Sequence, residues 1–367
     1  MLLTIPLAAR LAALLAVRLT VLLAARLAVP LAVRLAALLA VPLAAQLAVR
    51  PPDRGRDAFV PLDTESAGGS QIMSITVFLQ YCLAGISIGG IYALIAIGYT
   101  MVYGILRLIN FAHGDIFMMS AYFMIFAMVN FMIPWYISAV IVIVSTVALG
   151  VIIEKVAYKP LRNAPRMSIM ISAIGVSYLL QNLATYLFSA LPKPYPDIPV
   201  LNKTIYLGEV STSLVTFITP IITIAAVAGL LALLKYTKIG MAMRAVAKDF
   251  ETAQLMGIKI NSVISMTFVI GCSLAAVGSM LYFTPRPSVF PLAGSLPGLK
   301  CFVAAVFGGI GSIPGAVLGG FIIGLSETFI KAAGYSEFSD VFTFILLIVV
   351  LMFKPTGLFG ENMTEKV

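Results

Sequence analysis

Long apolar stretches, rather than a periodic mixture of apolar and polar residues, fill the chain from Met73 onward. A soluble helix shows apolar residues at every third or fourth position, whereas about 20 consecutive apolar residues are what a helix needs to cross a bilayer. The pattern predicts an all-α fold, a polytopic bundle of transmembrane helices with nine spans, or eight if the block at 297–310 only dips into the membrane. The nine blocks are 75–104, 115–131, 133–153, 168–190, 213–235, 263–283, 297–310, 315–332 and 338–353.

Composition agrees with a membrane protein, because 61% of the 367 residues are apolar and only 11% are charged, against roughly 25% charged residues in soluble domains. The net charge of +9 would suit a nucleic-acid partner, but the basic residues cluster between the apolar blocks, as in cytoplasmic loops. Cys82, Cys272 and Cys301 lie inside apolar blocks without the spacing of a metal or redox site. We predict a multi-pass protein of the plasma (inner) membrane that contacts the lipid bilayer, binds no nucleic acid and uses no cofactor or metal.

Charge in the connecting loops predicts the sidedness of the bundle. The loops at 154–167 and 236–261 each carry four Lys or Arg residues, against one and two acids, and loops with such a basic excess face the cytoplasm. The loop at 191–212 balances its charges and contains four prolines, which favour extended backbone. We expect this loop outside, which places Met73 outside and the carboxyl terminus inside, with an odd number of spans.

The first 72 residues follow a different pattern. Within residues 1–50, leucine stands at every fourth position and arginine recurs at intervals of eight. A four-residue period drifts about 40° per step around a 3.6-residue helix, so neither residue type holds one face. We predict that this Leu/Ala low-complexity repeat is not part of the native protein, which would start at Met73; a genuine extra anchor or an interfacial helix are the alternatives. Residues 51–72 are polar and indicate a linker, which leaves 73–367 as the transmembrane domain.

A short polar stretch, Leu108–Ile116, separates the first two apolar blocks and holds the single histidine of the chain. Its polar residues are Asn110, His113 and Asp115. Non-helical backbone at membrane depth is tolerated only where protein or a water-filled cavity satisfies it, so this break would line a translocation path. The alternative is an ordinary loop in which Asp115 caps the next helix. No second histidine, cysteine or nearby acid pair completes a metal or catalytic site around His113.

A second feature lies in the basic loop, where Met241–Gly257 predicts a short helix because its Ala, Met, Glu, Gln and Leu residues favour one. Val246 and Phe250 begin an apolar stripe at helical spacing that runs beside the charged residues. Such a stripe on the cytoplasmic face packs on the bundle itself, on lipid headgroups or in a groove of another protein.

Glycines at intervals of four predict close helix packing, since small residues at this spacing let helix backbones approach in lipid. These positions are Gly85, Gly89, Gly311, Gly315 and Gly319. The glycine-rich stretch at 307–320 is not a phosphate loop, and the whole sequence contains no G-x-x-x-x-G-K-[ST] motif. We therefore expect a chain that is not itself an enzyme and hydrolyses no nucleotide.

Charged residues near the apolar blocks are few. We expect four of them to lie at or near block ends and to extend their side chains to the membrane interface: Glu154, Lys300, Glu327 and Lys331. A carrier driven by an ion gradient would need an ionisable residue at mid-span, and none stands out in the sequence. The pattern favours a conduit whose energy is supplied elsewhere.

Taken together, the motifs resemble those of the permease subunits of branched-chain amino-acid ABC importers, a type of permease that urea and amide importers share. They cover nearly all of 73–367, whereas residues 1–72 depart from the family's pattern. The matching stretches are Gly85-Ile-Ser-Ile-Gly-Gly-Ile-Tyr-Ala-Leu94, Ile109-Asn-Phe-Ala-His-Gly-Asp115 with Met119-Ser-Ala-Tyr122, Arg244-Ala-Val-Ala-Lys-Asp249 with Leu255-Met-Gly257, and Phe307-Gly-Gly-Ile-Gly-Ser312 with Pro314-Gly315.

The resemblance implies an assembly with a second homologous permease subunit, two ABC ATPase subunits and a periplasmic or extracellular amino-acid-binding protein. It also implies that the cytoplasmic helix couples the chain to an ATPase, although Thr252 departs from the family's E-A-A-x-x-x-G loop. The residues of this coupling segment are Arg244, Lys248, Asp249, Glu251, Ala253 and Gly257. The implied function is import of leucine, isoleucine or valine; a permease for urea or short-chain amides and a self-sufficient ion-coupled carrier are the alternatives.

Overall fold

Helices dominate the fold, because a backbone surrounded by apolar side chains must satisfy its hydrogen bonds internally. The computed structural model describes residues 75–162, 164–207 and 210–360, so the predicted segments 1–50 and 51–72 lie outside the described residues. Within this described part, seven helical segments are long and apolar enough to cross a bilayer. The helices that form them are α2 (Ile75–Leu106), α4 (Trp135–Ile153), α5 (Arg166–Phe188), α6 (Leu214–Tyr236), α9 (Ile260–Phe283), α11 (Ile313–Ala332) and α12 (Ser339–Phe353).

Two of the predicted blocks form shorter helices. α3 (His113–Ile125) has 13 residues and continues into a π-helical turn, Phe126–Asn130. α10 (Ser295–Gly308) has 14 residues, or about 21 Å at 1.5 Å per residue, which is less than the ~30 Å hydrocarbon core. The block at 297–310 therefore forms a short helix, as the eight-span alternative anticipated, and α3 is a second short helix that the apolar pattern did not distinguish.

Other short helical turns and strands complete the described chain. α4 is extended by a π-helical turn and a 3₁₀ turn, and a 3₁₀ turn precedes α12. The bounds of these turns are Glu154–Tyr158, Lys159–Leu161 and Ser336–Phe338. The strands are β1 (Lys193–Pro194), β2 (Thr204–Leu207), β3 (Val210–Ser213) and β4 (Ser288–Val289), paired antiparallel as β1 with β4 and β2 with β3.

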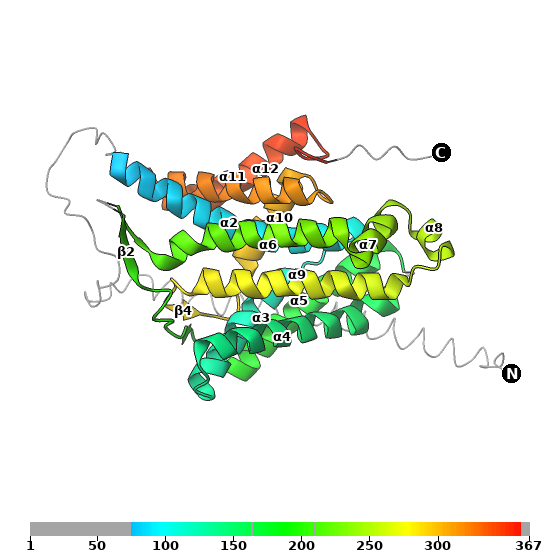
Figure 1. Ribbon diagram of the computed structural model, residues 1–367, viewed down its shortest axis with the longest axis horizontal. Coiled ribbons are helices and arrows are strands. Elements are labelled where there is room, and N and C mark those ends of the chain that lie inside the picture. Colours follow the sequence, from blue (N-terminus) through cyan, green and yellow to red (C-terminus); the bar gives the residue numbers. More distant parts are fainter. Residues whose placement is uncertain (1–74, 163, 208–209, 361–367) are drawn as a thin grey trace, which may run out of the picture. The chain divides into compact units, whose positions relative to one another are not determined.

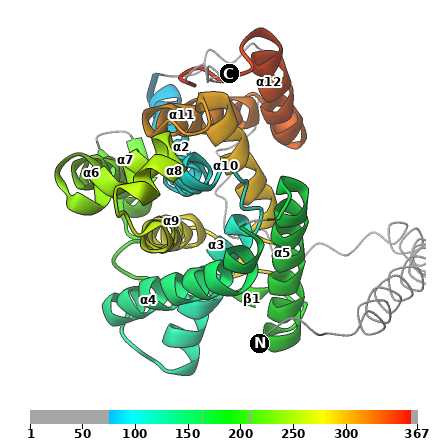
Figure 2. The same cartoon turned by 90° about the vertical axis from the view of Figure 1, so that its right-hand side faces the viewer.

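α2 is the central helix of the bundle. Figure 2 shows it surrounded by α6, α9, α10 and α11. Its middle, Ile91–Ile97, is buried on every side, as expected for a helix that is apolar all round. α2 and α11 run antiparallel, because Gly85 lies beside Leu325 and Gly89 beside Phe321. The central position of α2 makes it the frame against which the shorter helices are placed.

Four of the five predicted packing glycines lie at close backbone contacts. A Cβ built on Gly89 would stand 2.7 Å from the Phe321 Cα, and one on Gly85 would stand 3.1 Å from the Leu325 Cα. Gly315 faces Gly308, and Gly319 faces the Ala304 carbonyl group. In the same contact between α2 and α11, Gly320 of α11 lies against Ala93 of α2, and Gly324 of α11 lies against Gly89 of α2.

Gly311 is an exception, and the packing role predicted for it is wrong. It lies between α10 and α11 rather than inside a helix, with a φ of +97°. A Cβ at this position would meet no atom within 4 Å among the described residues. Its glycine is therefore needed for a left-handed turn, which the four-residue spacing in the sequence did not reveal.

The loops gather at the two ends of the bundle according to their charge. α7 (Lys238–Lys248) and α8 (Phe250–Leu255) lie at one end, and the paired strands lie at the other (Figure 1). The basic loops meet at the α7 end, where Arg162 donates to both Glu154 and Asn261. The pairing of β1 with β4 joins the 191–212 loop to the connection after α9 at the opposite end. This arrangement agrees with the predicted sidedness of the three loops.

Candidate functional site

The polar stretch after α2 brings the chain back into the bundle. Arg107 takes a φ of +56°, and its Nη2 donates to the Ala247 carbonyl of α7 over 3.1 Å. α3 then begins at His113, whose imidazole lies against Gly98. Gly98 is eight residues before the end of α2 at Leu106, about 12 Å along the helix axis. α3 therefore starts well inside the bundle rather than at its end.

The three polar residues of this break have different surroundings. Asn110 accepts a hydrogen bond from the Tyr158 hydroxyl over 2.7 Å. His113 is buried, with its ring centroid 4.9 Å from that of Tyr99 in an edge-to-face contact, and its Nε2 has no hydrogen-bond partner among the described residues. Asp115 lines a cavity. All three predicted break residues are buried, and Asp115 is the one of the three that lines the cavity.

α10 begins opposite α3, also inside the bundle. A Cβ on Gly114 would stand 2.8 Å from the Gly294 carbonyl oxygen and 3.0 Å from the Gly298 Cα. Glycine is required at these positions because any side chain would separate the two helix starts. Two short helices therefore meet at their N-terminal turns, where the helix dipoles favour negative charge; α3 has Asp115 in its first turn, whereas α10 has no acidic residue there.

A cavity of about 420 Å³ lies beside this contact, between α2, α3, α5 and α10. Its polar residues form one network: Ser177 donates to Asp115, and Gln181 Nε2 lies 3.1 Å from Asp115 Oδ1 and 3.4 Å from Ser295 Oγ. Apolar side chains complete the wall. The apolar and aromatic lining residues are Tyr99, Phe111, Ile174, Tyr178, Leu292, Leu299 and Phe302.

Sequence reasoning missed Ser177, Gln181 and Ser295. Ser177 and Gln181 are four residues apart, so they share one face of α5, and this spacing is a signal that the sequence contains. Other polar residues occur in the same block, such as Asn182 and Thr185. Only the packing of α5 beside α3 identifies the pair that faces Asp115.

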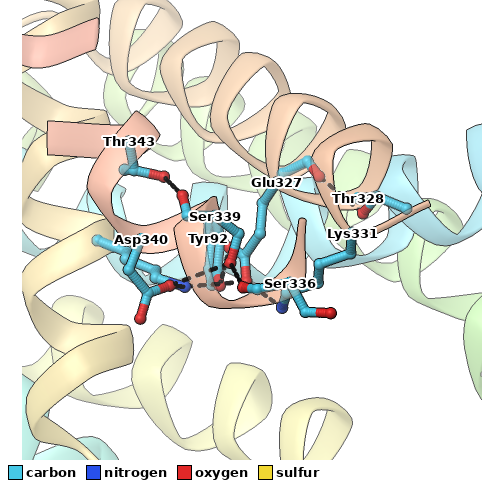
Figure 3. Close-up of polar contacts among 10 residues, drawn as sticks. Tyr92, Glu327, Thr328, Lys331, Ser336, Ser339, Asp340 and Thr343 are labelled. Carbon is cyan, nitrogen blue, oxygen red and sulfur yellow. Dashed lines mark hydrogen bonds and ion pairs between the residues drawn. The ribbon is translucent and has the colours of Figure 1, made fainter. Parts of the chain in front are cut away.

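A second polar cluster holds α10 in place. Lys300 Nζ of α10 lies 2.9 Å from Glu327 Oε1 of α11 and 2.5 Å from Asp340 Oδ1 of α12. The Tyr92 hydroxyl of α2 donates to Glu327 Oε2 over 2.7 Å, and Lys331 Nζ lies 2.5 Å from Glu327 Oε1. Figure 3 shows the side chains of Tyr92, Glu327, Lys331 and Asp340 close together. Pairing of this kind offsets the cost of removing these charges from water.

This cluster corrects the expectation that Lys300 and Glu327 extend their side chains to the membrane interface. Both side chains are buried, at 7% and 3% exposure. From the sequence, one can see only that these two residues lie near the ends of apolar blocks. The tertiary packing places oppositely charged partners beside them within the bundle. The same expectation is wrong for Glu154, which is buried and paired with Arg162. Lys331 is the half-exposed residue of the four, at 43%.

The candidate coupling segment is two helices instead of the single helix predicted for Met241–Gly257. α7 ends at Lys248, and Asp249 caps α8 by accepting from the Thr252 amide over 3.0 Å. Such a side-chain cap requires non-helical backbone, which breaks the predicted helix at Asp249. Gly257 follows α8 with a φ of +81°.

Burial divides the residues of this segment. Ala253 is buried, as is Val246 of the predicted stripe, so part of the stripe packs on the bundle. Arg244, Lys248, Asp249, Glu251 and Gly257 are exposed. The end of α8 also exposes large apolar side chains, with Leu255 at 87% and Met256 at 78%. α8 therefore presents an apolar tip surrounded by charges at the end of the bundle.

An apolar helix bundle in which two short helices meet at a polar cavity is an arrangement used by membrane transport proteins. The chain is thus a multi-pass membrane protein of the transport class. It belongs to the family described as "Branched-chain amino acid transport system / permease component", which matches residues 81–351.

Individual relatives agree with this assignment. The chain is 42% identical over 301 residues to the high-affinity branched-chain amino acid transport system permease protein LivH of Escherichia coli K12, covering 79% of this chain and 98% of that protein. It is 41% identical over 303 residues, with the same coverage, to BraD of Pseudomonas aeruginosa, which carries the same description. A probable branched-chain amino acid transport permease protein of Methanocaldococcus jannaschii is 28% identical over 284 residues, which are 73% of this chain and 88% of that protein.

Proposed function

We propose that this chain is the membrane-spanning permease subunit of an ABC importer that moves leucine, isoleucine and valine across the plasma (inner) membrane. One observation carries the proposal: the similarity to permeases named for branched-chain amino acid transport extends over 98% of their length. The sequence contains no phosphate-loop motif, which fits a non-catalytic subunit whose ATP is hydrolysed by partners.

The partners proposed are two ATPase subunits, a second homologous permease and an extracellular or periplasmic binding protein. The exposed apolar tip of α8 supports docking of an ATPase at this end, since an amphipathic helix with unpartnered apolar residues fits a groove of another protein. Leu255 and Met256 would enter that groove, and Arg244, Lys248 and Glu251 would surround it.

Motion at α7 has a direct route to the polar cavity. The Arg107 side chain bonds the Ala247 carbonyl of α7, and Arg107 begins the irregular stretch that leads to α3. A shift of α7 would therefore move the start of α3, where Asp115 lines the cavity. In this mechanism, ATP-driven closure of the ATPases changes the bundle between outward-open and inward-open states, and the path lies between the two permeases.

Purification and reconstitution test this function. Mild detergent extraction should copurify two ATPases and a second permease, and the complex in proteoliposomes should accumulate leucine only with ATP and the binding protein. Competition by isoleucine and valine, but not by urea, would assign the cargo. Accumulation of leucine by the isolated chain on an ion gradient would contradict the proposal, because that result requires no ATPase.

A further inference from the structure

Asp115 differs from the other buried carboxylates in the described residues. Glu154 is paired with Arg162, and Glu327 is paired with Lys300 and Lys331. Asp115 is 2% exposed, yet its hydrogen-bond partners are the neutral side chains of Ser177 and Gln181. No Lys, Arg or His lies within ion-pair distance of it in the described ranges. A buried charge without a counter-ion is costly and in membrane proteins marks a functional site.

Opposite this carboxylate, the cavity has a positive pole. Ser295 is the first residue of α10, and the first turn of α10 contains no acidic residue. The Ser295 and Gly298 amides donate to the Leu292 and Gly294 carbonyls, and Pro297 has no N–H, so it is the dipole of α10 and the Ser295 hydroxyl that favour an anion here. Gln181 Nε2 bridges the two poles, at 3.1 Å from Asp115 Oδ1 and 3.4 Å from Ser295 Oγ. The poles are therefore separated by a single amide group, which suits a ligand that carries an ammonium group and a carboxylate on the same carbon atom.

The remaining wall suits an aliphatic side chain. Ile174 of α5 and Leu292, Leu299 and Phe302 at α10 line the cavity. The volume of about 420 Å³ falls within the range of small-molecule sites, which are mostly apolar with a few placed polar groups. Leu292 and Leu299 are exposed on the chain by itself, so a second permease packed on this face would close the cavity.

We propose that this cavity is a cargo-binding site within the path, in which the Asp115 carboxylate binds the α-ammonium group and the start of α10 with Ser295 binds the α-carboxylate of an aliphatic amino acid. This inference rests on the proposed importer function. Such a site would distinguish amino acids from the alternative cargoes. Urea and short-chain amides carry no ammonium group and would gain no binding energy from Asp115.

The test uses the complete importer in nanodiscs, with Tyr178→Cys as a reporter that a small thiol reagent can label, because Tyr178 lines the cavity, is 62% exposed and has no binding role in the proposal. Leucine added without binding protein should slow labelling of this cysteine. Its analogue 2-hydroxy-4-methylpentanoate, in which a hydroxyl replaces the ammonium group, should protect at least about tenfold less well, because it leaves the buried carboxylate unpaired. Equal protection by the two compounds, or no protection by leucine, would overturn the proposal. This comparison requires no change at Asp115 and so does not depend on the folding of a variant at that position.

Asp115→Asn in the same background should abolish protection by leucine, whereas Asp115→Glu should keep the preference for leucine over the hydroxy acid. Glu337→Gln, which removes an exposed acid from the turn before α12, is the matched control and should leave protection unchanged. In proteoliposomes, leucine uptake by Asp115→Asn should fall at least about tenfold, while ATP hydrolysis stimulated by loaded binding protein persists. Full uptake in this variant would refute the site and leave the importer function standing; absence of uptake in the unaltered complex would refute the function itself.

Discussion

Lys300 of α10 lies 2.9 Å from Glu327 of α11, and both side chains are buried in a bundle of apolar helices. This pair, together with Tyr92 and Asp340, connects the short helix α10 to α2, α11 and α12. α10 also forms one wall of the polar cavity. The ion pair therefore holds this wall in position and also stabilises the fold.

Replacing Lys300 with Met should destabilise the protein by about 3 kcal/mol, since removing one partner leaves buried carboxylates without their cation. Thermal unfolding in detergent, followed by size-exclusion chromatography, measures the loss. Lys331→Met is the control on the same carboxylate. Its side chain is 43% exposed, and exposed ion pairs contribute about 0–1 kcal/mol. Equal losses in the two variants would contradict the importance of the buried position.

Gly89→Leu should weaken the contact between α2 and α11. A Cβ at Gly89 would stand 2.7 Å from the Phe321 Cα, and a backbone atom cannot move aside as a side chain can. We expect a loss of about 1–3 kcal/mol, seen as a lower unfolding temperature. Gly229→Leu in α6 is the matched control, because a Cβ there meets nothing within 4 Å. A similar loss of stability in both variants would show that replacing any helix glycine has this effect, and that the contact between α2 and α11 is not responsible.

Gly257→Val should abolish leucine uptake by the importer while the protein stays in the membrane. The φ of +81° at Gly257 is strained for a β-branched residue, whereas no neighbouring atom within 4 Å obstructs a side chain. The strain would therefore redirect the chain after α8 rather than unpack the bundle. Gly257→Asn, which tolerates left-handed backbone, should retain most of the uptake. Unimpaired leucine uptake by the Gly257→Val variant would refute the coupling role of this segment.

Leu255→Ser should reduce copurification of the ATPase and lower uptake, with no change in thermal stability. The Leu255 side chain is 87% exposed, so its apolar surface contributes nothing to the fold of this chain. Apolar residues at an interface centre contribute most of the binding energy. Phe290→Ser is the control and should leave ATPase binding intact, because Phe290 is an exposed apolar residue that directly follows β4, far along the chain from α8. Normal ATPase recovery with Leu255→Ser would place the docking site elsewhere.

Much of the fold follows from the sequence because lipid leaves a chain few options. Apolar blocks must be helices, basic loops face one side, and glycines at intervals of four permit close contacts. These rules predicted the bundle, the positions of its loops and the close approach at Gly85 and Gly89. They failed where an effect is not periodic: Gly311 serves a turn, and Asp249 divides the predicted coupling helix by capping α8.

By itself, the sequence determined the class of protein, the limits of the apolar segments and the presence of a polar break at Asn110–Asp115. Tertiary structure alone decided what that break faces. Hydropathy depends on residues next to one another in the chain, whereas the cavity depends on α3, α5 and α10, which are far apart in sequence. Their packing buries His113 and Asn110, leaves Asp115 with neutral partners, and pairs Lys300 with Glu327. Whether a charged side chain is paired depends on which residues lie near it in space, and the folded chain alone brings those residues together.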